Sequence, residues 1–309
     1  MNVETWTKGP SPILTATLPW EKGIVSEPAP FYNKALSRWE MYYGGGWNQN
    51  QIGRAVCCGD PSVAANWVKN PEPVIGPSAG NFWAYPAHQD VLVDANGYHI
   101  MFSITGANGV NMWLADSTDG VTFTVRPIPI LQNTYARVMG NSALFVDDDP
   151  DHTLYNMFDA VIEPAQGGDG IWRVYMARAA RIGGPWVEDT RGVISPLQLG
   201  TGAYGGLSIK KINGHYNAWG INAPTGNLPS YIYHHYSYEM LNWGVLNNGN
   251  PVLTITNENA DQIADPQVFD ATEYGGANSL MFYDTVLNAN GTGAIWVATS
   301  AGPLSTICP

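Results

Sequence analysis

The segment WVKNPEPVI at residues 67–75 decides the fold, because its pattern returns at regular intervals along the chain. A tryptophan is followed, after five residues, by proline and two aliphatic residues, and the first copy is WTKGPSPIL at 6–14. Copies with substitutions begin at Phe123 and Trp186, and a copy stretched by two residues begins at Trp243. Between equivalent positions of successive copies the spacings are 61, 56, 63 and 59 residues. Repeats at such a period are typical of β-propellers and solenoids.

Three β-like segments precede each of the last four copies, and three more precede the C-terminus. The middle segment is aromatic, as at 39–43 (WEMYY) and 98–102 (YHIMF), and the third is small and apolar, as at 295–298 (IWVA). Alternation with a period of two indicates strands rather than helices. The sequence therefore predicts an all-β fold, a five-bladed β-propeller of four-stranded antiparallel blades. The alternative is a β-sandwich in which the repeats are coincidental.

The two ends of the chain are expected to close the ring. The fifth repeat, which begins near Asp265, lacks the outer strand, whereas the copy at 6–14 has no three strands before it. Pairing 6–14 with the C-terminal strands would remove an open sheet edge. We therefore expect one domain over 1–309. Its blades are expected at 27–75, 86–131, 138–194, 204–253 and 264–304, the last completed by 6–14.

The composition excludes several classes of partner. The chain has 14 basic and 26 acidic residues and a net charge of -12, so it cannot build the basic face that nucleic acid requires. No apolar segment approaches the roughly 18 residues that cross a bilayer. The N-terminus has no basic segment followed by an apolar run, so no signal peptide is expected.

Cofactors are not expected either. Of three cysteines, Cys57 and Cys58 are adjacent and point to opposite faces of a strand, which argues against a disulfide framework. No Cys/His spacing is typical of zinc. No metal site is predicted, and a calcium ion in the channel is an alternative without support from a motif.

The innermost strand of each propeller blade lines the central channel. Aligning these strands by their apolar pairs places five residues at one level: Glu27, His88, Asn141, Gly205 and Asp265. Asp90 follows His88 by two residues. Because blades 5, 1 and 2 are neighbours, we expect Glu27, His88, Asp90 and Asp265 to converge at one end of the channel. Converging carboxylates raise one another's pKa, which suits general acid–base catalysis, although such groups could equally solvate a channel mouth.

Aromatic side chains in the connecting segments predict contacts with sugars, whose apolar ring faces stack on aromatic rings. The candidates for ligand binding, with polar neighbours and residues of the aligned level, are His88, Trp47, Trp83, Tyr85, Asn141, Arg137 and Tyr204. Most other tryptophans occupy repeat positions and are expected in the cores of the blades.

Blade 1 combines Glu27-Pro28, Tyr42-Tyr43-Gly44, Ile52-Gly53-Arg54-Ala55 and the segment 67–75, and blade 5 begins with Asp265-Pro266. Together these motifs resemble the five-bladed glycoside hydrolases of families 43, 32, 62 and 130. The resemblance covers the whole chain at the level of blades. It implies the propeller fold, a carbohydrate ligand and a carboxylate site in the channel.

The resemblance also implies catalytic roles. Glu27 stands where these enzymes carry an aspartate base or nucleophile, and Asp90 where they carry a modulating aspartate. Blade 3 has Gly140-Asn141 where they carry the glutamate acid, so the catalytic glutamate is not matched. Asp159 or Glu163 could replace it from another strand.

Two functions are compatible with this pattern. The first is a glycan-recognising propeller on a glycosidase-like scaffold. It would be a virion component, such as a phage tail or receptor-binding protein, in contact with other virion or surface proteins, which explains an extracellular-like composition without an export signal. The second is an active glycoside hydrolase, acting on oligosaccharides in the cytoplasm, with Glu27, Asp90 and Asp265 as catalytic carboxylates. The unmatched glutamate favours the first.

Overall fold

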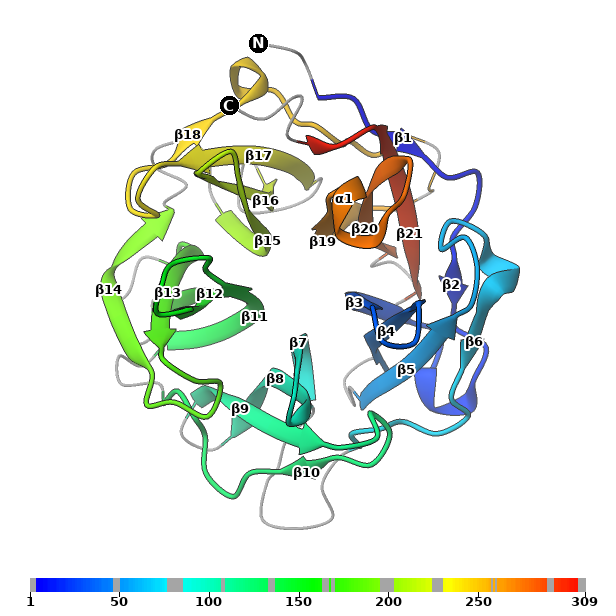
Figure 1. Ribbon diagram of the computed structural model, residues 1–309, viewed down its shortest axis with the longest axis horizontal. Coiled ribbons are helices and arrows are strands. Elements are labelled where there is room, and N and C mark those ends of the chain that lie inside the picture. The colour runs from blue at the N-terminus through cyan, green and yellow to red at the C-terminus, as the bar shows by residue number, and fades with distance from the viewer. Residues whose placement is uncertain are drawn as a thin grey trace.

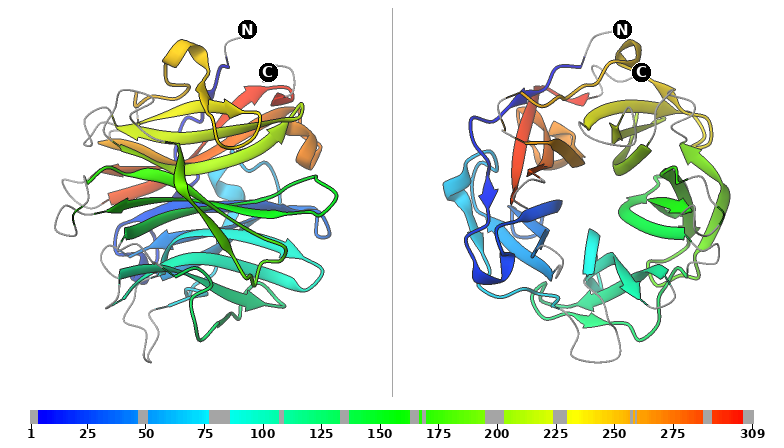
Figure 2. Two further views of the ribbon diagram at one scale, coloured as in Figure 1. Left: turned by 90° about the vertical axis from the view of Figure 1, so that its left-hand side faces the viewer. Right: turned by 180° about the vertical axis from the view of Figure 1, so that it is seen from behind.

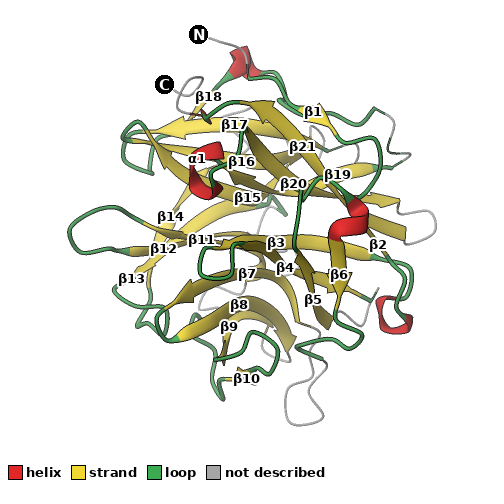
Figure 3. Cartoon of the chain, turned by 45° about the vertical axis from the view of Figure 1, so that its right-hand side comes forward, coloured by secondary structure: helices red, strands yellow, loops and turns green. Residues whose placement is uncertain are grey.

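The computed structural model describes residues 4–46, 51–76, 86–106, 109–132, 137–162, 167, 170–194, 203–223, 230–256, 258, 260–287 and 292–304. These residues form five antiparallel sheets that follow one another around a common axis (Figure 1). The predicted five-bladed β-propeller is confirmed. Among the described residues the helical structure is confined to short turns on the connections between strands (Figure 3). No described helix is long and apolar enough to cross a membrane.

The strands run outward from the axis in each blade. Blade 1 contains β3 (Val25–Asn33), β4 (Arg38–Gly45), β5 (Gln51–Cys57) and β6 (Trp67–Lys69). Blade 2 contains β7 (Pro86–Asp94), β8 (Gly97–Gly106), β9 (Gly109–Ser117) and β10 (Thr124–Val125). Blade 3 contains β11 (Arg137–Val146), β12 (Leu154–Ile162), β13 (Arg173–Ala179) and β14 (Val187–Ile194). Blade 4 contains β15 (Ala203–Ile212), β16 (His215–Ala223), β17 (Tyr231–Ser237) and β18 (Gly244–Val245).

Blade 5 joins the two ends of the chain. It contains β19 (Gln262–Phe269), β20 (Asn278–Leu287) and β21 (Thr292–Ala301), and its outer edge is completed by β1 (Thr7–Lys8) and β2 (Leu14–Thr15). Thr7 pairs with Thr299 and Leu14 with Ile295. The N-terminal strands and β21 lie side by side in the view from the front and in the view from behind (Figure 1 and Figure 2). The predicted closure of the ring by the N-terminal segment is therefore confirmed.

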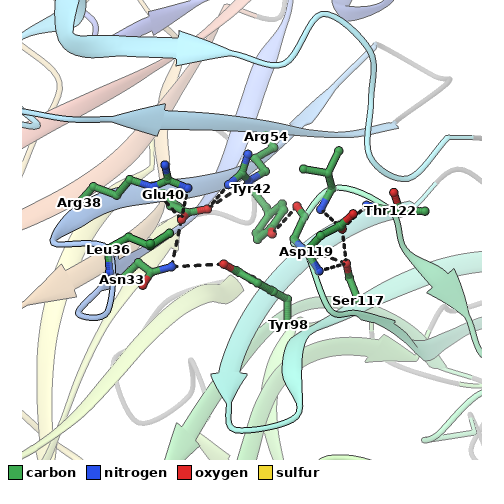
Figure 4. A network of polar contacts seen from close by, with 12 residues as sticks. Asn33, Leu36, Arg38, Glu40, Tyr42, Arg54, Tyr98, Ser117, Asp119 and Thr122 are labelled. Carbon is green, nitrogen blue, oxygen red and sulfur yellow. Dashed lines mark hydrogen bonds and ion pairs between the residues drawn. The ribbon is translucent and has the colours of Figure 1, made fainter.

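The cores lie between neighbouring blades rather than inside one blade. Tyr42 of blade 1 packs with Phe102 of blade 2, and Trp39 of blade 1 packs with Phe282 of blade 5. All four side chains are almost completely buried. Because each apolar layer takes residues from two blades, a single blade has no complete core. Polar contacts also cross these seams, since Asn33 of blade 1 donates a hydrogen bond to the Tyr98 hydroxyl of blade 2 (Figure 4).

Candidate functional site

Each innermost strand carries a β-bulge near its start, and the bulges build the candidate site. They lie between Ser26 and Ala29, Ala87 and Asp90, Met139 and Ser142, Gly205 and Leu207, and Ala264 and Gln267. Glu27, His88 and Asp265 have positive φ angles of 53°, 55° and 48° in their bulges. Non-glycine residues seldom adopt this conformation, and it concentrates at functional sites. In blade 4 the bulged residue is Gly206 (φ 52°), one residue beyond the Gly205 of the sequence alignment.

Glu27 and His88 form an ion pair between blades 1 and 2. The imidazole Nδ1 of His88 lies 3.0 Å from Glu27 Oε1, and the backbone N–H of His88 donates to Glu27 Oε2 at 2.7 Å. Burial raises the pKa of Glu27, but the charge and hydrogen bonds of His88 outweigh it, so the pKa is lowered. Burial lowers the pKa of His88, but the Glu27 carboxylate outweighs it and raises the pKa to about 10. The structure therefore holds Glu27 ionised and His88 protonated.

Asp159 extends this cluster into blade 3. His88 Nδ1 lies 2.9 Å from Asn141 Oδ1, and the Asn141 backbone N–H donates to Asp159 Oδ1 at 2.7 Å. The Gly206 N–H of blade 4 donates to Asp159 Oδ2 at 3.0 Å. Burial raises the pKa of Asp159, an effect that the nearby His88 opposes. A carboxylate from the second strand of blade 3 thus reaches the level that the innermost strands define.

Two glycines make room for this carboxylate. A Cβ added to Gly140 or to Gly205 would lie 3.0 Å from Asp159 Cγ and closer still to a carboxylate oxygen. The strand register places Asp159 opposite the bulge, where Tyr43, Phe102 and Tyr283 stand in blades 1, 2 and 5. Sequence analysis had offered Asp159 only as a substitute without a positional argument. A carboxylate at an otherwise aromatic position was the signal that could have identified it.

Asp265 and Asp284 contribute a second pair of carboxyl groups from blade 5. Asp284 Oδ2 accepts a hydrogen bond from the Glu27 backbone N–H at 2.9 Å, so this pair adjoins Glu27. Burial, with the charges of Asp284 and Glu27, raises the pKa of Asp265 well above its usual value. Burial raises the pKa of Asp284 to about 7. The Oδ1 atoms of both residues are buried and accept no hydrogen bond within the described structure. Burial and the neighbouring negative charges therefore favour the protonated form of Asp265, beside an ionised glutamate.

Asp90 has a different environment from the one expected. Its Oδ1 accepts from the Val91 N–H at 2.7 Å and its Oδ2 from the Leu144 N–H of blade 3 at 2.6 Å. Burial raises the pKa of Asp90 to about 7. Both oxygens thus hold backbone amides, one of them across a seam between blades, and these bonds give Asp90 a structural role.

Several predicted ligand-binding residues lie outside the described residues, namely Trp47, Trp83 and Tyr85, and Glu163 does too. Arg137 and Tyr204 belong to β11 and β15, but their side chains are not described. Their contacts with sugars stay predictions. Among the described residues, no group of three or more His, Cys, Asp or Glu side chains could hold a metal ion.

Several solved structures with a similar fold are glycoside hydrolases. One described as a glycoside hydrolase is 16% identical and superimposes with a TM-score of 0.71, covering 95% of this chain and 92% of its own. An α-L-arabinofuranosidase from Podospora anserina, in complex with cellotriose, is 10% identical with a TM-score of 0.70 and coverages of 97% and 98%. A thermostable family-43 glycoside hydrolase is 16% identical with a TM-score of 0.64 and coverages of 93% and 91%.

No protein family and no curated protein matches the sequence itself. At these identities the structural likeness shows a common fold, and the predicted resemblance to five-bladed glycoside hydrolases is confirmed at that level. None of these similar structures supports a virion role. Location in a virion and contact with other virion proteins stay predictions.

Proposed function

We propose that the protein is a glycoside hydrolase that acts on oligosaccharides through Glu27 and Asp265 in the channel. One observation carries the proposal: neighbouring carboxyl groups have pKa values shifted in opposite directions, Glu27 downward and Asp265 upward. Such a pair supplies a base or nucleophile and an acid at the same pH. The proposal replaces recognition without turnover as the favoured function, because Asp265 of blade 5 could supply the proton that the unmatched blade 3 glutamate would have supplied.

Each carboxyl group has a distinct part in the reaction. The protonated Asp265 would donate its proton to the glycosidic oxygen as the bond to the leaving sugar breaks. The ionised Glu27 would either attack the anomeric carbon or take a proton from the attacking water. His88 would keep Glu27 ionised and oriented through its ring and its backbone N–H. The similar structures include an arabinofuranosidase and an endo-arabinase, so arabinosides are the first substrates to try.

The test compares substrates whose leaving groups need protonation to different extents. Asp265→Asn should lower turnover of natural arabino-oligosaccharides by about 10²–10⁴-fold, which is the usual contribution of a general acid. It should affect aryl arabinosides with good leaving groups much less. Glu27→Gln should abolish turnover of both, while Asp148→Asn, on an exposed aspartate, serves as the matched control.

Two results would contradict the proposal. One is binding of glycans by the wild type without turnover of any arabinoside, xyloside, fructoside or mannoside, which would restore the recognition function. The other is an Asp265→Asn variant that loses equal activity on both leaving groups, since a proton donor must act more strongly on the poorer one.

A further inference from the structure

A cavity lies at the seam between blades 5 and 1, near the end of β3 that is farther from Glu27. Its volume is about 410 Å³, within the roughly 300–1,000 Å³ of small-molecule sites. Tyr32, in its wall, is five residues along β3 from Glu27, roughly 16 Å at about 3.3 Å per residue. The cavity is therefore separate from the channel site, and all residues that line it are described.

Three aromatic rings form one wall. The ring centroids of Tyr32 and Trp39 are 5.4 Å apart, those of Trp39 and Tyr274 5.0 Å, and those of Tyr32 and Tyr274 6.1 Å. Trp39 is only 2% exposed, whereas both tyrosines are half-buried and present ring surface to the cavity. Partly exposed aromatic rings in a concave site can stack on the apolar face of a sugar.

The polar part of the lining carries both donors and acceptors without net charge. Arg38 donates from Nε and Nη2 to Oε1 of the buried Glu40 at 3.0 and 2.9 Å, which fixes its guanidinium (Figure 4). Asp60 Oδ1 accepts from the backbone N–H and the hydroxyl of Ser62 at 2.9 and 2.6 Å. One positive and one negative group beside hydroxyls suit an uncharged polyhydroxylated ligand better than a phosphate or a cation.

Contacts within the protein fix the position of the aromatic wall. The Tyr274 hydroxyl donates to the Asn278 carbonyl, which anchors the ring at its polar end. A Cβ added to Gly276 would lie 2.5 Å from Tyr274 Cζ, so the ring can occupy this position only over a glycine. Trp39 is held from behind by Phe269, at 4.9 Å between centroids. A preformed site loses little conformational entropy on binding.

We propose that this cavity is a second carbohydrate site, which binds neutral sugar residues of a glycan chain. The choice of ligand rests on the proposed function, but turnover does not enter the argument. A short oligosaccharide would occupy one site at a time, because Glu27 and Tyr32 lie near opposite ends of β3. A polymer held here would raise the local concentration of further chain segments at the channel site.

A label on Cys58 can block the cavity without replacing the residues of its aromatic wall. Cys58 is exposed and lines the cavity, whereas Cys57 is buried. In a Cys308→Ser background, a bulky maleimide on Cys58 should fill the cavity. The matched control is Cys58→Ser with Val68→Cys, labelled with the same reagent, since Val68 is 69% exposed on β6 and does not line the cavity. Retardation in native gels containing arabinan, arabinoxylan or xylan reports binding, and turnover of an aryl arabinoside reports the channel site.

Blocking Cys58 should weaken retardation by at least about tenfold, equivalent to about 1.4 kcal/mol, while turnover of the aryl arabinoside stays within about twofold. The control label should change neither measurement, and Tyr32→Ala should weaken retardation as the blocking label does. Retardation that survives the block, or that is absent with all three polysaccharides, overturns the inference. Absence of turnover together with Cys58-dependent retardation would count against the proposed hydrolase and leave this site standing.

Discussion

Replacing Gly205 by alanine should displace the Asp159 carboxylate from the cluster. The new Cβ would lie 3.0 Å from Asp159 Cγ and 3.3 Å from Asp159 Cβ, and closer than either to Oδ2. Since real Cβ atoms essentially never approach within 3.0 Å of another atom, something has to move. The carboxylate is the free end of its side chain, so it moves before the backbone of β15 does.

The expected loss of stability follows from the two backbone N–H groups that donate to Asp159. The Asn141 and Gly206 N–H groups, now at 2.7 and 3.0 Å from its oxygens, would lose their acceptor. An unsatisfied buried donor costs about 1–3 kcal/mol, so Gly205→Ala should reduce the free energy of unfolding by about 2–6 kcal/mol. Turnover should fall as well, because Asp159 and its partner Asn141 support His88.

A double-mutant cycle isolates this effect from a general intolerance of alanine in the strand. Asp159→Ala removes the same acceptor, so adding Gly205→Ala to it should cost little more than Asp159→Ala alone. Gly76→Ala is the matched control, because its Cβ would meet nothing closer than Gln51 Oε1 at 3.6 Å. Unfolding in denaturant measures the stability of the four proteins of the cycle and of the Gly76→Ala control. Additive losses for Gly205→Ala and Asp159→Ala would refute the reasoning, since they would show that the two residues do not share this space.

Two further predictions concern stability. The Glu4 carboxylate accepts hydrogen bonds from Trp6 and Trp219 and pairs with His234 of blade 4. Glu4→Ala should therefore destabilise the closed ring by on the order of 1–3 kcal/mol for each donor that is left without an acceptor. Glu4→Gln should lose less stability, and equal melting temperatures of the wild type and both variants would contradict this role of Glu4. Asp90 should also contribute less to the free energy of unfolding as the pH rises from about 4 to about 7, because burial raises its pKa to about 7 and the folded state keeps a proton that the unfolded chain releases. Asp90→Asn should remove this contribution, and a pH dependence equal to that of the wild type in denaturant titrations would contradict the assignment.

The fold could be predicted because each blade repeats the same local pattern. A fifth repeat without an outer strand, and an outer strand at 6–14 without a repeat, left one way to pair all edges. The observed pairing of Thr7 with Thr299 follows from that count. The loops that enter the channel do not repeat in sequence, so no comparable argument places Trp47 or Trp83.

The site could be predicted only where the alignment of innermost strands applies. Glu27, His88 and Asp265 lie at one level, as expected, because the bulges occur at the same place in their strands. Asp90 was expected on the same face as His88, since residues two apart share a face of a strand. The bulge between Ala87 and Asp90 interrupts that alternation, and the Asp90 carboxylate holds the Leu144 amide of blade 3 instead.

Four carboxylates around the channel accept hydrogen bonds from neighbouring blades, and this distinguishes their environment from that of Asp265. Glu27 accepts from an amide of blade 2, Asp90 from blade 3, Asp159 from blade 4 and Asp284 from blade 1. Asp265 stands at the same level, but its Oδ1 accepts no hydrogen bond within the described chain. A proton on Oδ1 would therefore break no hydrogen bond to a neighbouring blade, which suits the general acid that we propose.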